Sequence, residues 1–118
     1  MNKNDLRILK EAINRAPDNI ALRLSYALKL FKIKEYDESE KNYHHVLKLD
    51  PENIKAKQGL IELYFAKGNY SAVIVIAEEL SARNLTSEKI LELQVKSLFR
   101  QNSLKEALLS VNVFVFSP

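Results

Sequence analysis

The chain has 118 residues, 47% of them hydrophobic and 28% charged, which are ordinary values for one soluble globular domain. Its 18 basic and 15 acidic residues give a formal charge of +3 and are interspersed along the chain, a pattern that favours a solvated helical surface over a nucleic-acid footprint. Because there is no cysteine, a disulfide framework and a zinc site built on thiolates are excluded.

Two amphipathic helices are predicted at the start of the chain. Apolar residues at helical spacing predict the first over 4–15, and Pro17 ends it because the residue before a proline is pushed out of the α region. The second helix is predicted over 20–31, and either Asp18 or Asn19 can serve as its N-terminal cap.

A third helix is predicted to run to Leu49 after a break near residues 34–35. Asp37 and Glu40 have the spacing of a capping box, which favours a helix start at this point. Asp50-Pro51 closes the helix, and Pro51 suits the first position of the next helix because proline is preorganised for it.

The following residues repeat this plan. A helix is predicted over 54–65, Gly68 can take the positive φ that closes it, and a further helix starts at Tyr70. The end of that helix lacks the expected proline. We therefore expect Asn84 or Ser87 to end this helix and cap the next one.

The last part of the chain predicts a helix over 90–99, a turn at 101–102 and a final helix that starts at Ser103, where Glu106 completes another capping box. Residues 111–118 are β-branched and aromatic, and no polar capping helix follows them. Three interpretations are open: the segment packs loosely, it pairs with another copy, or the chain is a piece of a longer protein. An uncovered apolar edge favours the last two together, with self-association through the C-terminal helix.

The predicted elements recur with a period of thirty-four residues. Sliding the sequence by that offset places Pro17 over Pro51 and Phe31 over Phe65, and a second slide brings Phe65 onto Phe99. A period of this length, filled by two short helices, indicates a unit that buries its apolar face only by stacking on copies of itself. We therefore expect an all-α array of about seven helices.

The units resemble the tetratricopeptide repeat. In the middle unit the residues that match its signature are Lys57, Leu60-Ile61, Tyr64, Gly68-Asn69-Tyr70, Val73, Ala77, Leu80 and Leu85. The resemblance covers residues 17–118 and implies a right-handed α-superhelix, or solenoid, of antiparallel helix pairs. It divides a single domain into a half-repeat at 4–16 and repeats at 17–50, 51–84 and 85–118, and it leaves truncation of the last repeat open.

Some residues depart from the family pattern. Ser39 stands where alanine is usual, and Gln94 stands where a large apolar residue is usual. Ile61 and Val73 are bulkier than the small residues of the family, and overfilling a close helix contact typically costs about 1–3 kcal/mol.

In this family the first helix of each unit lines a concave groove that binds an extended peptide or a partner's helix. The resemblance therefore implies a non-enzymatic protein-interaction module, a scaffold or adaptor. It places on the groove Leu24, Leu28, Phe31, Lys55, Gln58, Glu62, Phe65, Lys89, Glu92, Lys96, Phe99 and Arg100. The groove would be apolar at one end and charged, with a basic excess, at the other, which favours an apolar or acidic-hydrophobic segment as partner.

Some members of the family hold a C-terminal carboxylate with a clamp of two basic residues and two asparagines. The matching positions here are Leu24, Leu28, Gly59, Lys89 and Leu93. Only Lys89 could act in such a clamp, so we expect a groove without one. Gly59 is expected to lie on the groove face of its helix.

No catalytic or metal-binding pattern is present. His44 and His45 are adjacent, so they point about 100° apart on a helix and cannot chelate one metal ion as an i,i+4 pair would. There is no glycine-rich phosphate loop, no His-Glu-x-x-His run and no nucleophile elbow. We expect no enzyme activity, no cofactor, no metal and no small-molecule substrate.

Three alternatives to a peptide-binding groove stay open. The first is that the groove positions are solvated faces without a ligand. The second is a nucleic-acid binder that uses the basic residues Lys55, Lys89, Lys96 and Arg100. The third is a regulatory or targeting domain of a larger enzyme.

Neither a signal peptide nor a membrane span is predicted. Residues 1–5 lead into a helix of mixed charge instead of an apolar signal core. The longest apolar run, 73–77, is far shorter than the roughly 20 residues that cross a bilayer. We therefore expect a cytoplasmic location and no membrane binding.

Overall fold

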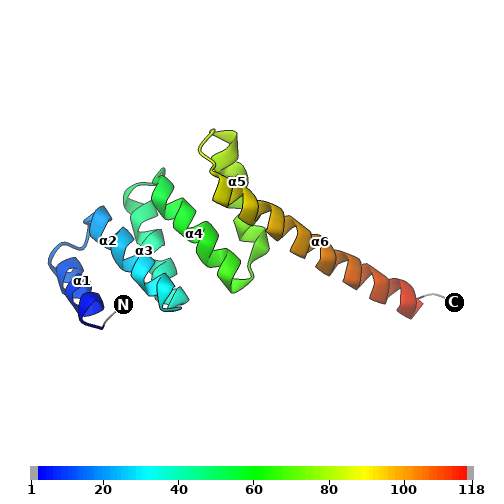
Figure 1. The fold of residues 1–118 in the computed structure, drawn as a ribbon, viewed down its shortest axis with the longest axis horizontal. Helices are drawn as coiled ribbons and strands as arrows, with labels where there is room; N and C mark the ends of the chain where they lie inside the picture. The colour runs from blue at the N-terminus through cyan, green and yellow to red at the C-terminus, as the bar shows by residue number, and fades with distance from the viewer. Residues whose placement is uncertain (1–2, 117–118) are drawn as a thin grey trace. The chain divides into compact units, whose positions relative to one another are not determined.

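The computed structural model describes the backbone of residues 3–116 and the side chains of residues 4–103 and 105. Within that range all regular elements are helices and none is a strand, which confirms the all-α prediction (Figure 1). The helices are α1 (Lys3–Arg15), α2 (Ile20–Lys32), α3 (Tyr36–Leu49), α4 (Ile54–Lys67), α5 (Tyr70–Ala82) and α6 (Glu88–Phe116).

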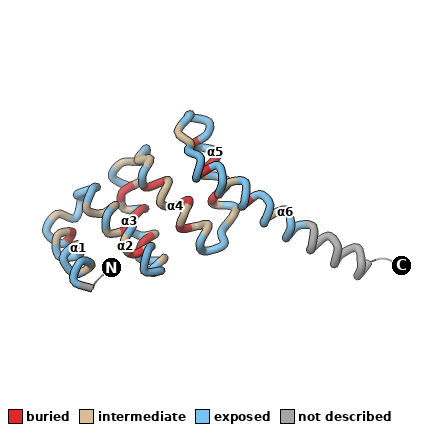
Figure 2. Tube along the Cα trace, in the orientation of Figure 1, coloured by how far each residue is buried: buried red, intermediate tan, exposed pale blue. Residues whose placement is uncertain are grey.

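The helices form two compact units, Met1–Leu63 and Tyr64–Pro118. In the first unit α1 packs on α2 and α2 packs on α3, and in the second unit α5 packs on α6. Helix α4 begins in the first unit and ends in the second. Each unit buries apolar residues of its own, shown in red in Figure 2. Packing between consecutive helices is the arrangement of helical-repeat proteins, as the period predicts.

Three helices begin with the same side-chain cap, at positions thirty-four residues apart. The side chains of Asn19, Asn53 and Ser87 each accept a hydrogen bond from the backbone N–H three residues later, at 3.1, 2.9 and 3.3 Å. These bonds satisfy N–H groups that a helix start leaves without an intrahelical partner. Pro51 lies in the turn before Asn53, so its prediction as the first helical residue is wrong.

The turns inside the helix pairs also repeat. Lys34 and Gly68 have φ values of 66° and 78°, in the left-handed region. The residues that follow them, Glu35 and Asn69, donate their N–H to the carbonyl five residues earlier, at 2.9 and 2.8 Å. Both turns therefore close a helix by a left-handed residue, as predicted for Gly68.

The capping box predicted from Asp37 and Glu40 is wrong. Helix α3 begins one residue earlier, at Tyr36, and its N-cap Glu35 makes no side-chain capping bond. Asp37 lies inside the first turn, where its carboxylate interacts favourably with the positive end of the helix dipole. The left-handed turn at Lys34, rather than a capping side chain, sets this helix start.

The break predicted at residues 101–102 is wrong, because α6 continues without interruption from Glu88 to Phe116. The described range therefore has six helices where about seven were expected. Residues 88–116 include neither glycine nor proline. Asparagine at position 102 destabilises a helix by less free energy than glycine or proline would. Ser103 is consequently not a helix start. The predicted self-associating segment 111–118 lies outside the residues whose side chains the structure describes.

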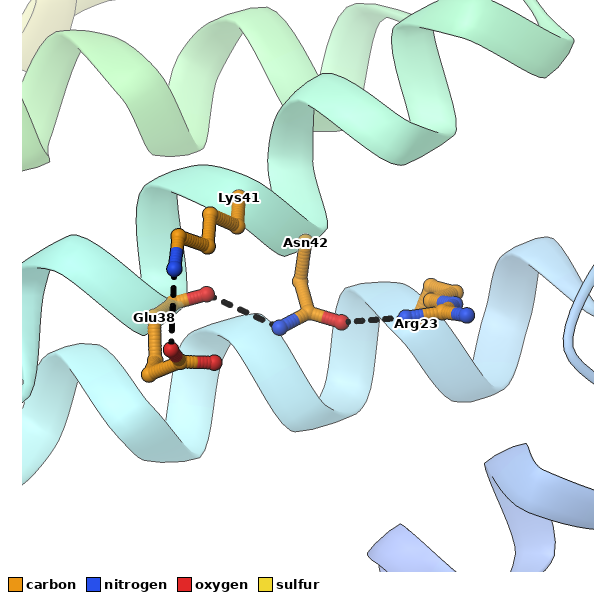
Figure 3. Close-up of polar contacts among 4 residues, drawn as sticks. All are labelled: Arg23, Glu38, Lys41 and Asn42. Atoms are coloured by element: carbon orange, nitrogen blue, oxygen red, sulfur yellow. Dashed lines mark hydrogen bonds and ion pairs between the residues drawn. The ribbon is translucent and has the colours of Figure 1, made fainter.

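A chain of polar contacts joins α2 to α3 (Figure 3). Arg23 on α2 donates from Nη1 to Oδ1 of Asn42 on α3 at 2.9 Å, and Nδ2 of Asn42 donates to the Glu38 carbonyl at 2.8 Å. The Glu38 carboxylate forms an exposed ion pair with Lys41 at 3.3 Å. Because Asn42 is buried, these bonds satisfy an amide that would otherwise destabilise the interface.

Ser39, the residue that replaces the usual alanine, lies fully buried between the same two helices. Its hydroxyl donates to the Ala27 carbonyl on α2 at 2.7 Å. A buried hydroxyl is tolerated in this interface because the Ala27 carbonyl satisfies it with a hydrogen bond. Ile61 and Val73 are also fully buried, so their larger side chains are accommodated in the first and second unit respectively.

Candidate partner-binding surfaces

The predicted groove residues of α2 share one helix face in the first unit. Leu24, Leu28 and Phe31 follow one another at intervals of four and three residues, which places them along one side of a helix. Leu28 is 40% exposed, and the other two are partly buried. Phe31 packs on Tyr36 with ring centroids 5.7 Å apart, so the turn holds this end of the face in place.

On α4 the predicted residues Lys55, Gln58 and Glu62 also share one face by helical spacing. Lys55 is exposed, while Gln58 and Glu62 are half-buried. Gly59 does not offer open surface as expected, because the ring of Tyr43 occupies the space beside its Cα. The glycine therefore allows α3 to approach α4 closely.

In the second unit the structure brings together two predicted residues, Phe65 and Arg100, with Tyr70. The Arg100 guanidinium carbon lies 4.9 Å from the centroid of the Phe65 ring and 5.5 Å from that of Tyr70. Arg100 Nη1 donates a hydrogen bond to the Tyr70 hydroxyl at 2.9 Å. The two rings are themselves 5.7 Å apart, nearly edge to face. The guanidinium is thus fixed by two aromatic faces and one hydrogen bond.

Three further predicted residues, Lys89, Glu92 and Lys96, follow at intervals of three and four along α6. Lys96 Nζ and Glu92 Oε1 are 2.7 Å apart, and the hydrogen bond from Lys96 lowers the pKa of the Glu92 carboxyl. Both side chains are exposed, so the pair contributes little stability. It does neutralise part of the basic excess predicted for this end of the groove.

A hollow of about 400 Å³ opens beside Arg100. The described residues that line it are Tyr70, Phe99, Arg100 and Ser103. Phe99 is 68% exposed, which is unusual for a large apolar side chain without a contact on its outer face. The hollow therefore combines an aromatic wall with a fixed positive charge.

The sequence prediction missed Tyr70 and Ser103 as parts of this surface. Tyr70 was predicted only as the start of a helix, although the spacing of Phe65 and Tyr70 repeats that of Phe31 and Tyr36 and could have indicated a paired ring contact. Ser103 was assigned to a helix start. The unbroken α6 instead carries it past Arg100 to the same hollow.

Neighbouring histidines contact different carboxylates. His44 Nε2 lies 3.5 Å from Glu40 on the same helix, and His45 Nε2 lies 3.2 Å from Asp18 in the turn before α2. Among the side chains that the structure describes, no group of three or more His, Asp or Glu residues is placed to hold a metal ion. Over the same described residues, no helix has both the length and the apolar character that crossing a membrane requires.

Comparison with known proteins identifies one family. A family model described as "Tetratricopeptide repeat" matches residues 34–96, which is more than half of the chain. No curated protein matches the chain.

Proposed function

The chain belongs to the tetratricopeptide-repeat family, whose members generally bind protein partners, and we propose that it is a non-enzymatic adaptor that binds a peptide or helix of a partner on the inner faces of its helices. The observation that carries the proposal is the exposure of Leu28 and Phe99, large apolar residues at predicted groove positions, in the first and the second unit. Apolar anchors of this kind supply most of the binding energy at protein interfaces.

The proposed groove has no carboxylate clamp. Leu24, Leu28 and Leu93 are apolar, and the ring of Tyr43 covers Gly59, so four of the five matching positions offer no side-chain donor to a carboxylate. The proposed partner segment is therefore held by apolar side chains, with acidic residues beside them. The repeat boundaries at 17–50, 51–84 and 85–118 are part of the same proposal, and the repeated caps at Asn19 and Asn53 support them.

Titration of the isotope-labelled chain with acidic amphipathic peptides tests the proposal. We expect resonances of Leu28, Phe65 and Arg100 to shift, and Leu28→Asp to weaken binding because it places a carboxylate on the apolar face. Val75→Asp is the matched control, since Val75 is 66% exposed on α5, outside the predicted groove. Unmoved resonances, or equal weakening by both variants, would overturn the proposal.

A nucleic-acid ligand is less well supported. The Lys96–Glu92 pair reduces the charge available to phosphates on α6, whereas nucleic-acid binding depends on several unpaired basic residues. Binding to mixed oligonucleotides with a steep salt dependence would favour this alternative instead.

Self-association is a second candidate function, favoured by an apolar stripe on α6. Leu91, Val95 and Leu98 recur at intervals of four and three residues and are each between 39% and 49% exposed. Ile61, which lies thirty-four residues before Val95, is fully buried, so the corresponding face of a preceding unit is covered. We propose that a second copy covers this stripe. Sedimentation velocity should show a dimer that Val95→Asp dissociates, and a monomer at high concentration would exclude it.

A further inference from the structure

We propose that the hollow beside Arg100 is an anchoring site for an acidic side chain, Asp or Glu, that is followed by a large apolar residue in the partner segment. This inference rests on the proposed protein-binding function and names the chemistry that one of its surfaces recognises.

The charge of Arg100 is the first part of the argument. Its guanidinium has five N–H donors, and among the residues that the structure describes it donates only to the Tyr70 hydroxyl. No described carboxylate forms an ion pair with it, in contrast to Lys96, which Glu92 neutralises. The surface therefore presents a cation that lacks an acidic counterpart within the described part of the chain.

The rigidity of Arg100 is the second part. Contacts to the faces of Phe65 and Tyr70 and the bond to the Tyr70 hydroxyl restrict a side chain that would otherwise lose much rotamer entropy on binding. A planar guanidinium held in this way can pair with a carboxylate through two parallel hydrogen bonds, and little further ordering is required. Ser103 lines the same hollow, and a serine side chain is a second donor of suitable type.

The shape of the hollow is the third part. Its volume of about 400 Å³ falls within the range of about 300–1,000 Å³ that ligand sites have. The exposed ring of Phe99 forms one side, so an apolar side chain next to the carboxylate would remove that ring from water. A phosphate or a free acidic metabolite would use the charge but not the aromatic wall. The combination therefore favours an acidic-apolar pair of residues.

The test uses short peptides with blocked termini and a central Glu-Phe pair, titrated into the full-length isotope-labelled chain. We expect shifts of the Arg100 Nε–H, Tyr70 and Phe99 resonances, and an affinity about tenfold or more lower for the Gln-Phe peptide and for Arg100→Gln. Arg100→Lys should lose nearly as much, because lysine lacks the two-pronged donor geometry. Arg15→Gln on α1 changes the net charge equally and should leave the affinity unchanged.

The outcomes separate this inference from the proposed function. If groove peptides bind but the Glu-Phe and Gln-Phe peptides bind equally, or Arg100→Gln has no effect, the anchoring site is wrong and the adaptor function stands. If a Gln-Phe peptide with a free C-terminus binds as well as the blocked Glu-Phe peptide, the site binds the C-terminal carboxylate of a peptide. The assignment to an acidic side chain is then overturned. If no peptide binds anywhere on the chain, both proposals fall.

Discussion

The ring of Tyr43 on α3 lies directly against Gly59 on α4, over the point where a β-carbon of residue 59 would stand. Tyr43 is itself buried, so the ring cannot swing out into solvent without exposing apolar surface. Glycine is thus required here by a neighbouring side chain, not by the backbone conformation. The pair fixes how closely α3 and α4 approach within the first unit.

We expect Gly59→Ala to lower the free energy of unfolding by about 1 kcal/mol. Helix propensity alone would raise it by about 1 kcal/mol, but forcing a methyl group against the Tyr43 ring costs about 1–3 kcal/mol. Urea denaturation provides the measurement. In a Tyr43→Ala background the same substitution should become stabilising, since the obstructing ring is gone. A loss that is equal in both backgrounds would mean that the ring is not the cause.

Stability should also fall at high pH because of Tyr43. Burial raises the pKa of Tyr43 to about 12, and the Glu62 carboxylate adds to the shift. Since an unfolded tyrosine has a pKa of about 10, the unfolded chain releases a proton between these values that the folded chain retains. The free energy of unfolding therefore decreases as the pH rises through this window, by up to about 1.4 kcal/mol per pH unit.

Tyr43→Phe isolates this effect, because phenylalanine keeps the ring and removes the titrating hydroxyl. Urea denaturation below and within the window should give a smaller loss of stability for the variant than for the unchanged chain. Equal losses would assign the alkaline instability to other tyrosines or to lysines.

Two buried serines should respond in opposite ways to the same substitution. Ser39 donates to the Ala27 carbonyl, whereas the buried hydroxyl of Ser97 on α6 has no hydrogen-bond partner among the residues that the structure describes. Ser39→Ala should therefore destabilise the chain by about 1 kcal/mol, the net value of a typical hydrogen bond. Ser97→Ala should stabilise it by about 1 kcal/mol, because it removes an unsatisfied polar group and favours the helix. Thermal melts of the two variants compare them directly, and shifts of equal sign would contradict the assignment.

Much of the fold was predictable because local chemistry repeats with the period. Asn19 and Asn53 cap helices at corresponding positions, and Gly68 closes a helix where only a left-handed residue fits. The wrong break at residues 101–102 has the same origin. Asn102 follows Gly68 by one period, which suggested a turn at the same place. Asparagine has a higher helix propensity than glycine, and at this position α6 continues through it.

The candidate site was only partly predictable. The family resemblance assigned Phe65 and Arg100 to a groove, but it could not show that Arg100 contacts Tyr70, thirty residues earlier in the chain. That contact depends on the angle and register at which α5 packs against α6. Both are set by how the side chains of the two buried faces fit together, which a sequence pattern does not give. Gly59 was misassigned for a similar reason, since the Tyr43 ring comes from another helix.

Two of the left-handed turn residues, Lys34 and Gly68, should change stability in opposite directions when glycine is introduced at the first and removed at the second. Lys34 has φ 66°, a conformation that costs an L-residue with a β-carbon roughly 1–2 kcal/mol, whereas Gly68 at φ 78° avoids that cost. Nothing lies within 4 Å of a β-carbon built on Gly68, so no steric contact adds to the backbone term. Lys34→Gly should therefore stabilise the chain, by about 0.5 kcal/mol after the entropy that glycine adds to the unfolded chain is subtracted. Gly68→Ala should destabilise it by about 1 kcal/mol. Urea denaturation of both variants gives the two changes, and a Lys34→Gly variant less stable than the unchanged chain would contradict the prediction.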